Sequence, residues 1–457
     1  MAMGRCYLIQ DPYHVYAASF IDVIFRTWGH KAICLYTDEK VRFYERDAFP
    51  ILDSDRIETS VDLDGESLAA VAKRLQRRYD IAGIVPFSEP TVANAAELAA
   101  QLGLSWCSPE VVRRFRDKFA LKQWLRERYP ALRLNASRRV TSAADVLAGP
   151  LPDRYVLKPN DGFGNSAIGM FDKGTPRQRL DDFFRAHPPR NWLLEEFIGG
   201  TEYFVNGQVG AHGEIDVFAI FEYERRPANG RENLDHLTWR LPRSAPEYEQ
   251  LEHYARQVVA ATGLVRSPFH LEAKIDEKGP CLIEVGARLV GNGNAYVCNE
   301  LHGNALDLFH VAAHHYLSAE PYGPLPLDWK HYDATELVYV HGVSTETAVI
   351  ETLEGIAEVE RLPEFAGWVR RPTIGMQVVP TVGLLTSPYC LLLRGKSKQK
   401  LREVSGLVRA LITWNRSADA ASTVQALGYQ LREKLSKRLG WELYGKPLSR
   451  VRKLALL

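Results

Sequence analysis

The segment Pro268–Asn294 constrains the fold of this chain most, because two short apolar runs in it are joined by a turn. Each run carries one glutamate, Glu272 in the first and Glu284 in the second. This spacing predicts an antiparallel hairpin whose two carboxylates face one cavity. Arg288 follows shortly after, and two anionic ligands beside a fixed guanidinium suit a magnesium-bound phosphate in transfer. A surface hairpin with an ordinary salt bridge is the alternative interpretation.

The composition is that of a globular protein large enough for about two to four domains. The chain has 457 residues, 46% of them hydrophobic and 25% charged, and a formal net charge of +1. This charge gives no overall attraction to nucleic acid, and neither a long apolar span nor a signal peptide is recognisable. The six cysteines form no CxxC pair, which argues against a zinc site or a disulfide framework. We therefore expect a cytoplasmic protein with small-molecule partners, no nucleic acid and no membrane contact, and a homodimer by default.

The N-terminal third alternates strand and helix patterns, which predicts an open, mainly parallel sheet. Glu89 comes directly after the last of these strands, at the edge where such sheets bind ligands. A charge at the start of a helix would explain Glu89 equally well. The predicted strands are Arg5–Gln10, Lys31–Tyr36 and Ile81–Pro86, and the predicted helices are Val15–Trp28, Ser67–Tyr79 and Val92–Leu102.

A glycine loop follows the predicted strand Arg154–Pro159, after a charged helix at Pro109–Arg128. Gly162 and Gly164 would let backbone N–H groups approach an anion, and Lys158 at the strand end can reach the same anion. Hairpin turns use the same residue types, so a turn without a ligand stays open.

A buried strand is predicted at Asn191–Phe197, with a glycine turn after it and a further strand at Tyr203–Gly207. Backbone groups left open before such a turn can hydrogen-bond the edge of a purine, and Glu202 can accept from ribose hydroxyls. Alternatively, Glu195, Glu196 and Glu202 form a solvated edge.

In order along the chain, these segments resemble the ATP-grasp superfamily. The matching motifs are DKFALKQWL with Lys118, YVLKP with Lys158, the glycine loop, LLEEFIGGTEY, HLEAKI and LIEVGARLVG. The resemblance covers about residues 5 to 410 and is strongest to the L-amino acid ligases, the dipeptide-forming branch to which bacilysin synthetase belongs. It implies an α/β fold with an open parallel-sheet domain, a two-lobed ATP-grasp core of α+β type and a small β-rich C-terminal subdomain. The expected boundaries are 1–109, 110–190, 191–330 and 331–412, with a basic helical tail at 413–457.

The resemblance also implies roles for individual residues. Many ATP-grasp enzymes have an asparagine two residues after the last glutamate as a further metal ligand, whereas this chain has Gly286. The number of bound magnesium ions therefore stays open. The implied roles are ATP phosphate binding by Lys118 and Lys158, with Gly162 and Gly164 beside them; adenine binding by the main chain of Glu196 and Ile198; ribose binding by Glu202; magnesium binding by Glu272 and Glu284; stabilisation of an acyl phosphate by Arg288; and a substrate pocket formed by Glu89, His270, Arg288, Asn292 and Asn294.

The function implied by the resemblance is that of an ADP-forming carboxylate–amine ligase that joins two amino acids, or an amino acid and a related acid. The resemblance also implies a small-peptide natural-product pathway. ATP and Mg²⁺ are the implied cofactors. Two alternatives stay open: an ATP-grasp ligase with a non-amino-acid acceptor, as in purine synthesis, and a nucleotide-binding scaffold without turnover.

Several other motifs are given structural interpretations. Gly395-Lys396-Ser397 lacks the first glycine of a P-loop, because Cys390 stands there. His310 and His314 lie one helical turn apart without an acidic third ligand, so a packing helix is favoured over zinc. Tyr13 and His14 fit a helix-start turn, and the basic segment 432–453 fits a solvated helix better than one that binds nucleic acid or membrane.

Overall fold

The computed structural model describes residues 5–12, 15–37, 50–63, 65–89, 91–162, 167–187, 191–291 and 293–415. The chain divides into two compact units. The first contains the described residues up to Gly162 together with 167–220 and 242–329, and the second contains 221–241 and the described residues from Lys330 on. The mixed α/β fold class is confirmed, while the five-part division expected from the sequence stays a prediction. Tyr13, His14, Gly164, Asn292 and the segment 432–453 lie outside the described residues.

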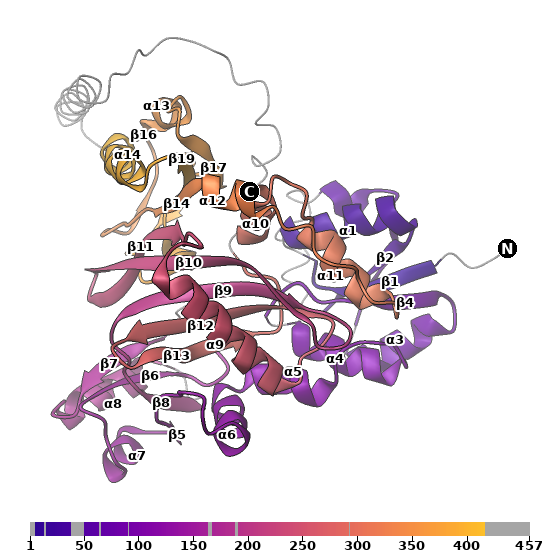
Figure 1. Cartoon of the computed structure of the whole chain (residues 1–457), viewed down its shortest axis with the longest axis horizontal. Helices are drawn as coiled ribbons and strands as arrows, with labels where there is room; N and C mark the ends of the chain where they lie inside the picture. Colours follow the sequence, from indigo (N-terminus) through magenta and orange to yellow (C-terminus); the bar gives the residue numbers. More distant parts are fainter. Residues whose placement is uncertain are drawn as a thin grey trace. The chain divides into compact units, whose positions relative to one another are not determined.

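The first sheet of unit 1 is parallel and four-stranded, in the order β3-β2-β1-β4. Helices α3 and α4 pack on the face that carries Cys6 and Leu8. Helix α11 packs closely on β4, since a Cβ added at Gly83 would lie 2.3 Å from the carbonyl oxygen of Tyr316; Figure 1 shows α11 next to α1. The bounds are β1 Arg5–Gln10, α1 Val15–Trp28, β2 Lys31–Tyr36, β3 Ile57–Asp62, α3 Leu68–Gln76, β4 Asp80–Val85, α4 Val92–Gln101, α10 Asn294–Leu301 and α11 Leu308–Leu317.

The second sheet of unit 1 is antiparallel, in the order β5-β8-β6-β7. Tyr155, Leu157, Trp192 and Leu194 form its core with the helices α7 and α8. The two central strands, β6 and β8, pair directly in antiparallel register, with Tyr155 opposite Glu196 and Pro159 opposite Trp192. The bounds are β5 Ser137–Val140, α7 Ala143–Ala148, β6 Arg154–Pro159, β7 Gly169–Asp172, α8 Arg177–Ala186 and β8 Trp192–Glu196.

The third group of strands in unit 1 pairs in the order β13-β12-β9, with the first part of β10 beyond β9. Helix α9 packs against β9, β12 and β13, and it ends at Gly263, whose φ of 75° is the left-handed conformation that glycine adopts most readily. The bounds are α5 Pro109–Arg116, α6 Lys118–Arg128, β9 Thr201–Val209, β10 Ile215–Ala228, α9 Pro246–Thr262, β12 Ser267–Asp276 and β13 Gly279–Gly286.

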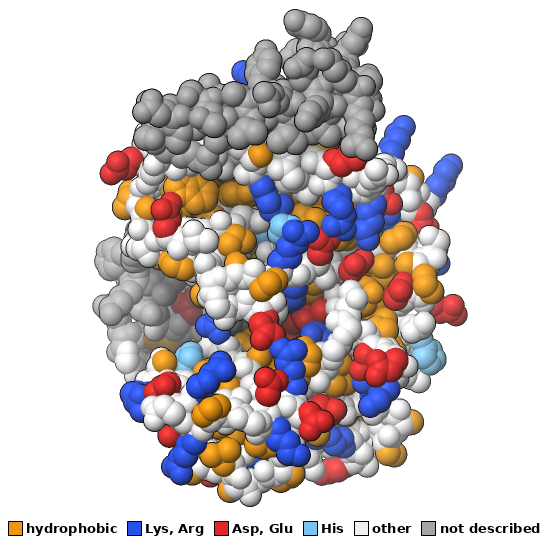
Figure 2. All heavy atoms as spheres, turned by 90° about the vertical axis from the view of Figure 1, so that its left-hand side faces the viewer, with side chains coloured by type: hydrophobic (Ala, Val, Ile, Leu, Met, Phe, Trp, Pro, Cys, Tyr) orange, Lys and Arg blue, Asp and Glu red, His pale blue; other side chains and the backbone are white. Residues whose placement is uncertain are grey.

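Unit 2 is built on an antiparallel sheet in the order β10-β11-β14-β19-β17, beginning with the part of β10 after Ile220. Helix α14 covers it, with Leu401, Val404 and Val408 packed against the buried residues of β14 and β19. Figure 2 shows one face of the molecule, on which Lys and Arg side chains are interspersed with Asp and Glu side chains. The bounds are β11 Arg231–Arg240, α12 Trp329–Ala334, β14 Glu336–His341, β15 Ala348–Val349, β16 Leu353–Glu354, α13 Ile356–Glu360, β17 Phe365–Arg370, β18 Gln377–Val378, β19 Cys390–Gly395, α14 Lys398–Leu411 and β20 Thr413–Trp414.

The sequence predicts no disulfide framework, no zinc site at His310 and His314, and no membrane-spanning segment. All six cysteines lie among the described residues, are buried and form no disulfide. His310 stacks on Trp28 with ring centroids 5.2 Å apart, and its Nδ1 lies 3.2 Å from the hydroxyl of Tyr322, as in a packing helix. In the described part of the chain, no helix is both long and apolar enough to cross a membrane.

Candidate active site

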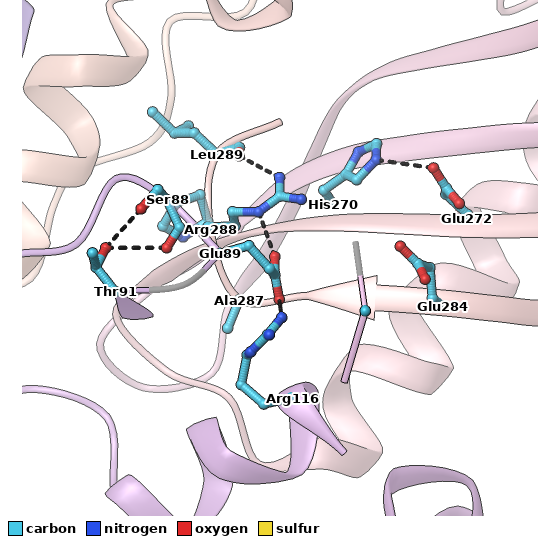
Figure 3. Close-up of polar contacts among 12 residues, drawn as sticks. Ser88, Glu89, Thr91, Arg116, His270, Glu272, Glu284, Ala287, Arg288 and Leu289 are labelled. Carbon is cyan, nitrogen blue, oxygen red and sulfur yellow. Dashed lines mark hydrogen bonds and ion pairs between the residues drawn. The ribbon is translucent and has the colours of Figure 1, made fainter. Parts of the chain in front are cut away.

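The predicted hairpin of the two glutamates is present as β12 and β13. Glu272 and Glu284 are direct partners in its antiparallel register. The register shifts immediately after this pair, which leaves Ile283 as an extra residue on β13. Such a bulge re-aims neighbouring side chains. Figure 3 shows the two carboxylates on the same side of the hairpin, and both side chains keep some exposure, 18% for Glu272 and 30% for Glu284.

Lys118 connects the hairpin to the glycine loop. Its ammonium lies 3.3 Å from the Glu284 carboxylate and donates to the carbonyl oxygen of Gly162 at 2.6 Å. The start of α6 fixes this lysine, because the Asp117 carboxylate caps the helix at Ala120 N–H and also accepts from the side-chain amide of Asn160. Burial raises the pKa of Glu284, but Lys118 and Lys158 outweigh burial and hold this pKa at about 2. Glu284 is therefore a carboxylate at neutral pH.

Lys158 is the last residue but one of β6 and forms an ion pair with Glu195 on the neighbouring strand β8, with 2.7 Å between Nζ and Oε2. Its ammonium also lies 3.5 Å from the carbonyl oxygen of the bulge residue Ile283. Burial disfavours the charged lysine, but Glu195 and Glu284 raise its pKa above the ordinary value. The alternative of a solvated edge is wrong for Glu195, which is only 2% exposed because β8 is a central strand.

Glu89 binds two arginines with its two carboxylate oxygens. Oε1 lies 2.6 Å from Arg116, Oε2 accepts from Nε of Arg288, and Figure 3 shows Glu89 between the two guanidinium groups. Burial raises the pKa of Glu89, but Arg288 and Arg116 lower it below its usual range. Burial likewise disfavours the Arg288 cation, and Glu89 raises its pKa again. Both carboxylate oxygens of Glu89 contact an arginine. The contact between Glu89 and a substrate ammonium stays a prediction.

Gly286 has a steric explanation. A Cβ added there would lie 3.0 Å from Oε2 of Glu89, which is closer than ordinary van der Waals contact. A side chain at this place would therefore require the carboxylate that holds Arg288 to shift by a few tenths of an ångström. Gly286, where this chain departs from the wider pattern, thus lies directly against Glu89.

His270 and Asn294, two predicted pocket residues, are joined through Asn206. The Nδ1 of His270 lies 2.9 Å from Oδ1 of Asn206, whose amide donates to Oδ1 of Asn294 at 3.1 Å. The other ring nitrogen of His270 lies 3.4 Å from Glu272. This buried network orients the imidazole next to the first carboxylate of the hairpin.

The segment predicted to bind adenine and ribose also makes contacts within the protein. The carbonyl oxygen of Glu196 accepts from the amide of Asn135 at 3.0 Å. Lys274 donates to the carbonyl oxygen of Ile198 at 3.1 Å and lies 3.7 Å from Glu202. A carbonyl oxygen has two lone pairs, so each keeps the capacity for a second donor.

The two hairpin carboxylates fit a magnesium ion. Mg²⁺ usually takes one or two protein carboxylates and completes its octahedron with water and substrate phosphates. Among the described residues no cluster of three or more His, Cys, Asp or Glu could hold a metal ion by itself. The pair Glu272 and Glu284, with Lys118 and Lys158 beside it, suits a metal that arrives with a phosphate.

The sequence analysis missed three buried or half-buried residues of this site: Lys122, Asn135 and Arg116. Lys122 lies one helical turn after Lys118 between buried leucines, and a lysine on the apolar side of a helix is a signal that could have been used. Arg116 and Asn135 lack such a local signal, because their partners Glu89 and Glu196 are far away in sequence.

Comparison with known proteins gives matches in sequence and in structure. Residues 178–295 match the family model of the ATP-grasp domain. Dapdiamide A synthase of Enterobacter agglomerans is 27% identical over 245 residues, which cover 50% of this chain and 55% of that protein. The chain spans between 55% and 59% of the length of the curated relatives it matches.

Among solved structures, an L-amino acid ligase from Bacillus licheniformis matches with a TM-score of 0.70 at 17% identity, over 91% of this chain and 100% of that chain. N5-carboxyaminoimidazole synthetase from Staphylococcus aureus, solved in complex with ADP, matches with a TM-score of 0.63 at 11% identity, over 89% of this chain and 98% of that chain. These similarities confirm the predicted ATP-grasp fold.

Proposed function

Because the chain carries an ATP-grasp domain and resembles the L-amino acid ligases, we propose that it is an ADP-forming carboxylate–amine ligase that joins two amino acids, or an amino acid and a related acid. The observation that carries this proposal is the direct pairing of Glu272 with Glu284, beside Lys118 and Lys158. A protein that only bound a nucleotide would not need both carboxylates and the nearby Arg288.

In the proposed reaction, an oxygen of the first substrate's carboxylate attacks the γ-phosphorus of ATP, and ADP leaves. The amine of the second substrate then attacks the acyl carbon, the C–O bond to phosphate breaks, and the nitrogen loses a proton as the amide forms. Splitting the reaction this way supplies a leaving group that a free carboxylate lacks. The products are an amide, ADP and phosphate.

The residues of the chain have separate tasks in this scheme. Lys118 and Lys158 would bind phosphate oxygens, and Glu272 and Glu284 would hold Mg²⁺, which when bound would neutralise negative charge. Gly162 would provide backbone near the phosphates, and the same role for Gly164, which lies outside the described residues, stays a prediction. The adenine lies against the main chain of Glu196 and Ile198, and the ribose against Glu202.

Arg288 stabilises the negative charge of the acyl phosphate and of the tetrahedral adduct. Its guanidinium is held in place by Glu89, so it needs little reorganisation when charge develops, and a fixed cation counts for more where solvent is excluded. The substrate pocket would include Glu89, His270, Arg288 and Asn294, and Asn292, which lies outside the described residues, stays a prediction. Dapdiamide A synthase as a relative supports placing the product in small-peptide biosynthesis, and six buried cysteines without a disulfide fit the cytoplasm.

The test is phosphate release from ATP and Mg²⁺ across a grid of amino acids, singly and in pairs, with mass spectrometry of every positive mixture. The proposal predicts phosphate only with particular pairs and a product lighter than their sum by one water. Phosphate with one amino acid and a non-amino-acid amine would favour the alternative acceptor. Nucleotide binding with no phosphate in any mixture would favour the scaffold.

A further inference from the structure

Lys122 is one of the most deeply buried charged side chains in unit 1. It is 1% exposed, and its ammonium lies between Oε1 of Glu195 and Oδ1 of Asn135, at 2.8 Å from the latter. Burial lowers the pKa of Lys122 to about 8, although Glu195 favours the charged form. A buried lysine is costly, so its retention in the protein interior calls for a reason.

The two partners of Lys122 lead to two different parts of the proposed nucleotide site. Glu195 uses its second oxygen to hold the ammonium of Lys158 at 2.7 Å. Asn135 uses its amide nitrogen to donate to the carbonyl oxygen of Glu196 at 3.0 Å. Lys122 is therefore linked, through one side chain in each direction, to a proposed phosphate-binding cation and to a proposed adenine-binding carbonyl group.

Helix α6 supplies both lysines from one face. Lys118 and Lys122 are four residues apart, so they project on the same side of the helix. Arg126, four residues further, donates to Ser137 at 2.7 Å and fixes the segment after Asn135. This face of α6 therefore makes three contacts: Lys118 with Gly162, Lys122 with Glu195, and Arg126 with Ser137 at the start of β5.

The charges of this group explain why one glutamate meets two lysines. A single Lys158–Glu195 pair would be neutral, and Glu195 would compete with a phosphate for the lysine. Lys122 takes the other oxygen of Glu195, so that the three groups together keep one positive charge. That charge is available to a phosphate at Lys158, the member that also lies near Glu284.

We propose that Lys122 is a positioning residue of the nucleotide site, which places the Lys158 ammonium through Glu195 and the Glu196 carbonyl group through Asn135. The inference rests on the proposed function, since it assumes that a nucleotide binds between these two groups. Lys122 itself does not touch the nucleotide. It acts through the Lys158 ammonium, which contacts the phosphates, and through the Glu196 carbonyl group, which contacts the adenine.

The test compares Lys122→Met, which keeps the length of the side chain and removes its charge, with wild type. The dissociation constant of ADP with Mg²⁺ is measured by calorimetry, and the KM of ATP and of the second substrate by phosphate release. We expect the ADP dissociation constant and the ATP KM to rise about tenfold or more, the scale of one charge-assisted hydrogen bond. The KM of the second substrate should change less than about twofold. Lys73→Met, at an exposed lysine of α3, is the matched control.

A merely structural lysine gives a different pattern. Its loss would lower the unfolding temperature and leave the ADP dissociation constant of the folded protein unchanged, which would overturn the inference. If Lys122→Met does not fold, Asn135→Leu removes the branch to Glu196 together with one of the two partners of Lys122, and unchanged ADP affinity in that variant would also overturn the inference. Wild-type protein without affinity for ADP and Mg²⁺ would instead refute the proposed function, and this inference with it.

Discussion

Replacing Glu195 by Gln should change both the stability of the protein and its dependence on pH. Glu195 is 2% exposed and is the only carboxylate that pairs with both Lys122 and Lys158 in the described part of the chain. The amide would leave two buried ammonium groups without their anion. Losing one partner of a buried ion pair typically costs about 3–5 kcal/mol, and we expect a loss of this size at pH 7.

The pH dependence follows from the pKa of Glu195. Burial raises this pKa, but Lys122 and Lys158 outweigh burial and lower it from 4.5 to about 2. The carboxylate then binds fewer protons in the folded than in the unfolded state, so its stabilisation is fully present above pH 4.5 and is lost as the pH falls toward 2. A shift of this size corresponds to about 3 kcal/mol.

Urea unfolding at several pH values between 7 and 3 measures both effects, with circular dichroism and tryptophan fluorescence followed together as a check of cooperativity. Wild type should lose stability in acid more steeply than Glu195→Gln, and the two should approach each other at low pH. Glu277→Gln, at the exposed turn of the hairpin, is the control. A constant difference between wild type and Glu195→Gln at every pH would refute the assignment of a lowered pKa to Glu195.

Three further predictions concern the hairpin and Arg288. Glu284→Gln should abolish phosphate release while circular dichroism stays that of the wild type, because magnesium loses an anionic ligand; retained turnover would remove Glu284 from the metal site. Arg288→Ala should lower kcat/KM by a factor that corresponds to a loss of at least about 3 kcal/mol in transition-state stabilisation, with a smaller effect on ATP affinity. An equal loss of ATP binding would make Arg288 a nucleotide ligand instead. Gly286→Asn should destabilise the protein by about 1–3 kcal/mol and displace Glu89 from Arg288, as measured by unfolding and kcat/KM; wild-type behaviour in both assays would contradict the steric explanation.

Local pattern was sufficient for much of the fold. The strands Arg5–Gln10 and Lys31–Tyr36 and the helix Val15–Trp28 have the predicted bounds, because each has a strong apolar pattern of its own. Strand β3, Ile57–Asp62, was missed, since it lies at the sheet edge and alternates exposed with partly buried residues. An edge strand carries little hydrophobic signal.

In the candidate site too, contacts within one segment could be predicted from the sequence, whereas contacts between distant segments could not. The pairing of Glu272 with Glu284 followed from spacing along one hairpin. The contacts of Glu89 with Arg116 and Arg288 join three segments, and no pattern within one segment specifies such contacts. Glu195 was given a solvated-edge alternative because two adjacent glutamates are usually exposed, and only the position of β8 inside its sheet shows that Glu195 is buried.

The central claim is that a carboxylate is activated by transfer of the γ-phosphoryl group of ATP. The test uses the substrate pair identified in the amino acid grid. The substrate whose carboxylate is activated carries ¹⁸O in that carboxyl group, and the released phosphate is analysed by mass spectrometry. Attack of the carboxylate on phosphorus carries one carboxyl oxygen into phosphate when the amide forms, so the account predicts phosphate with one ¹⁸O for each amide made. Unlabelled phosphate released together with the amide would contradict it.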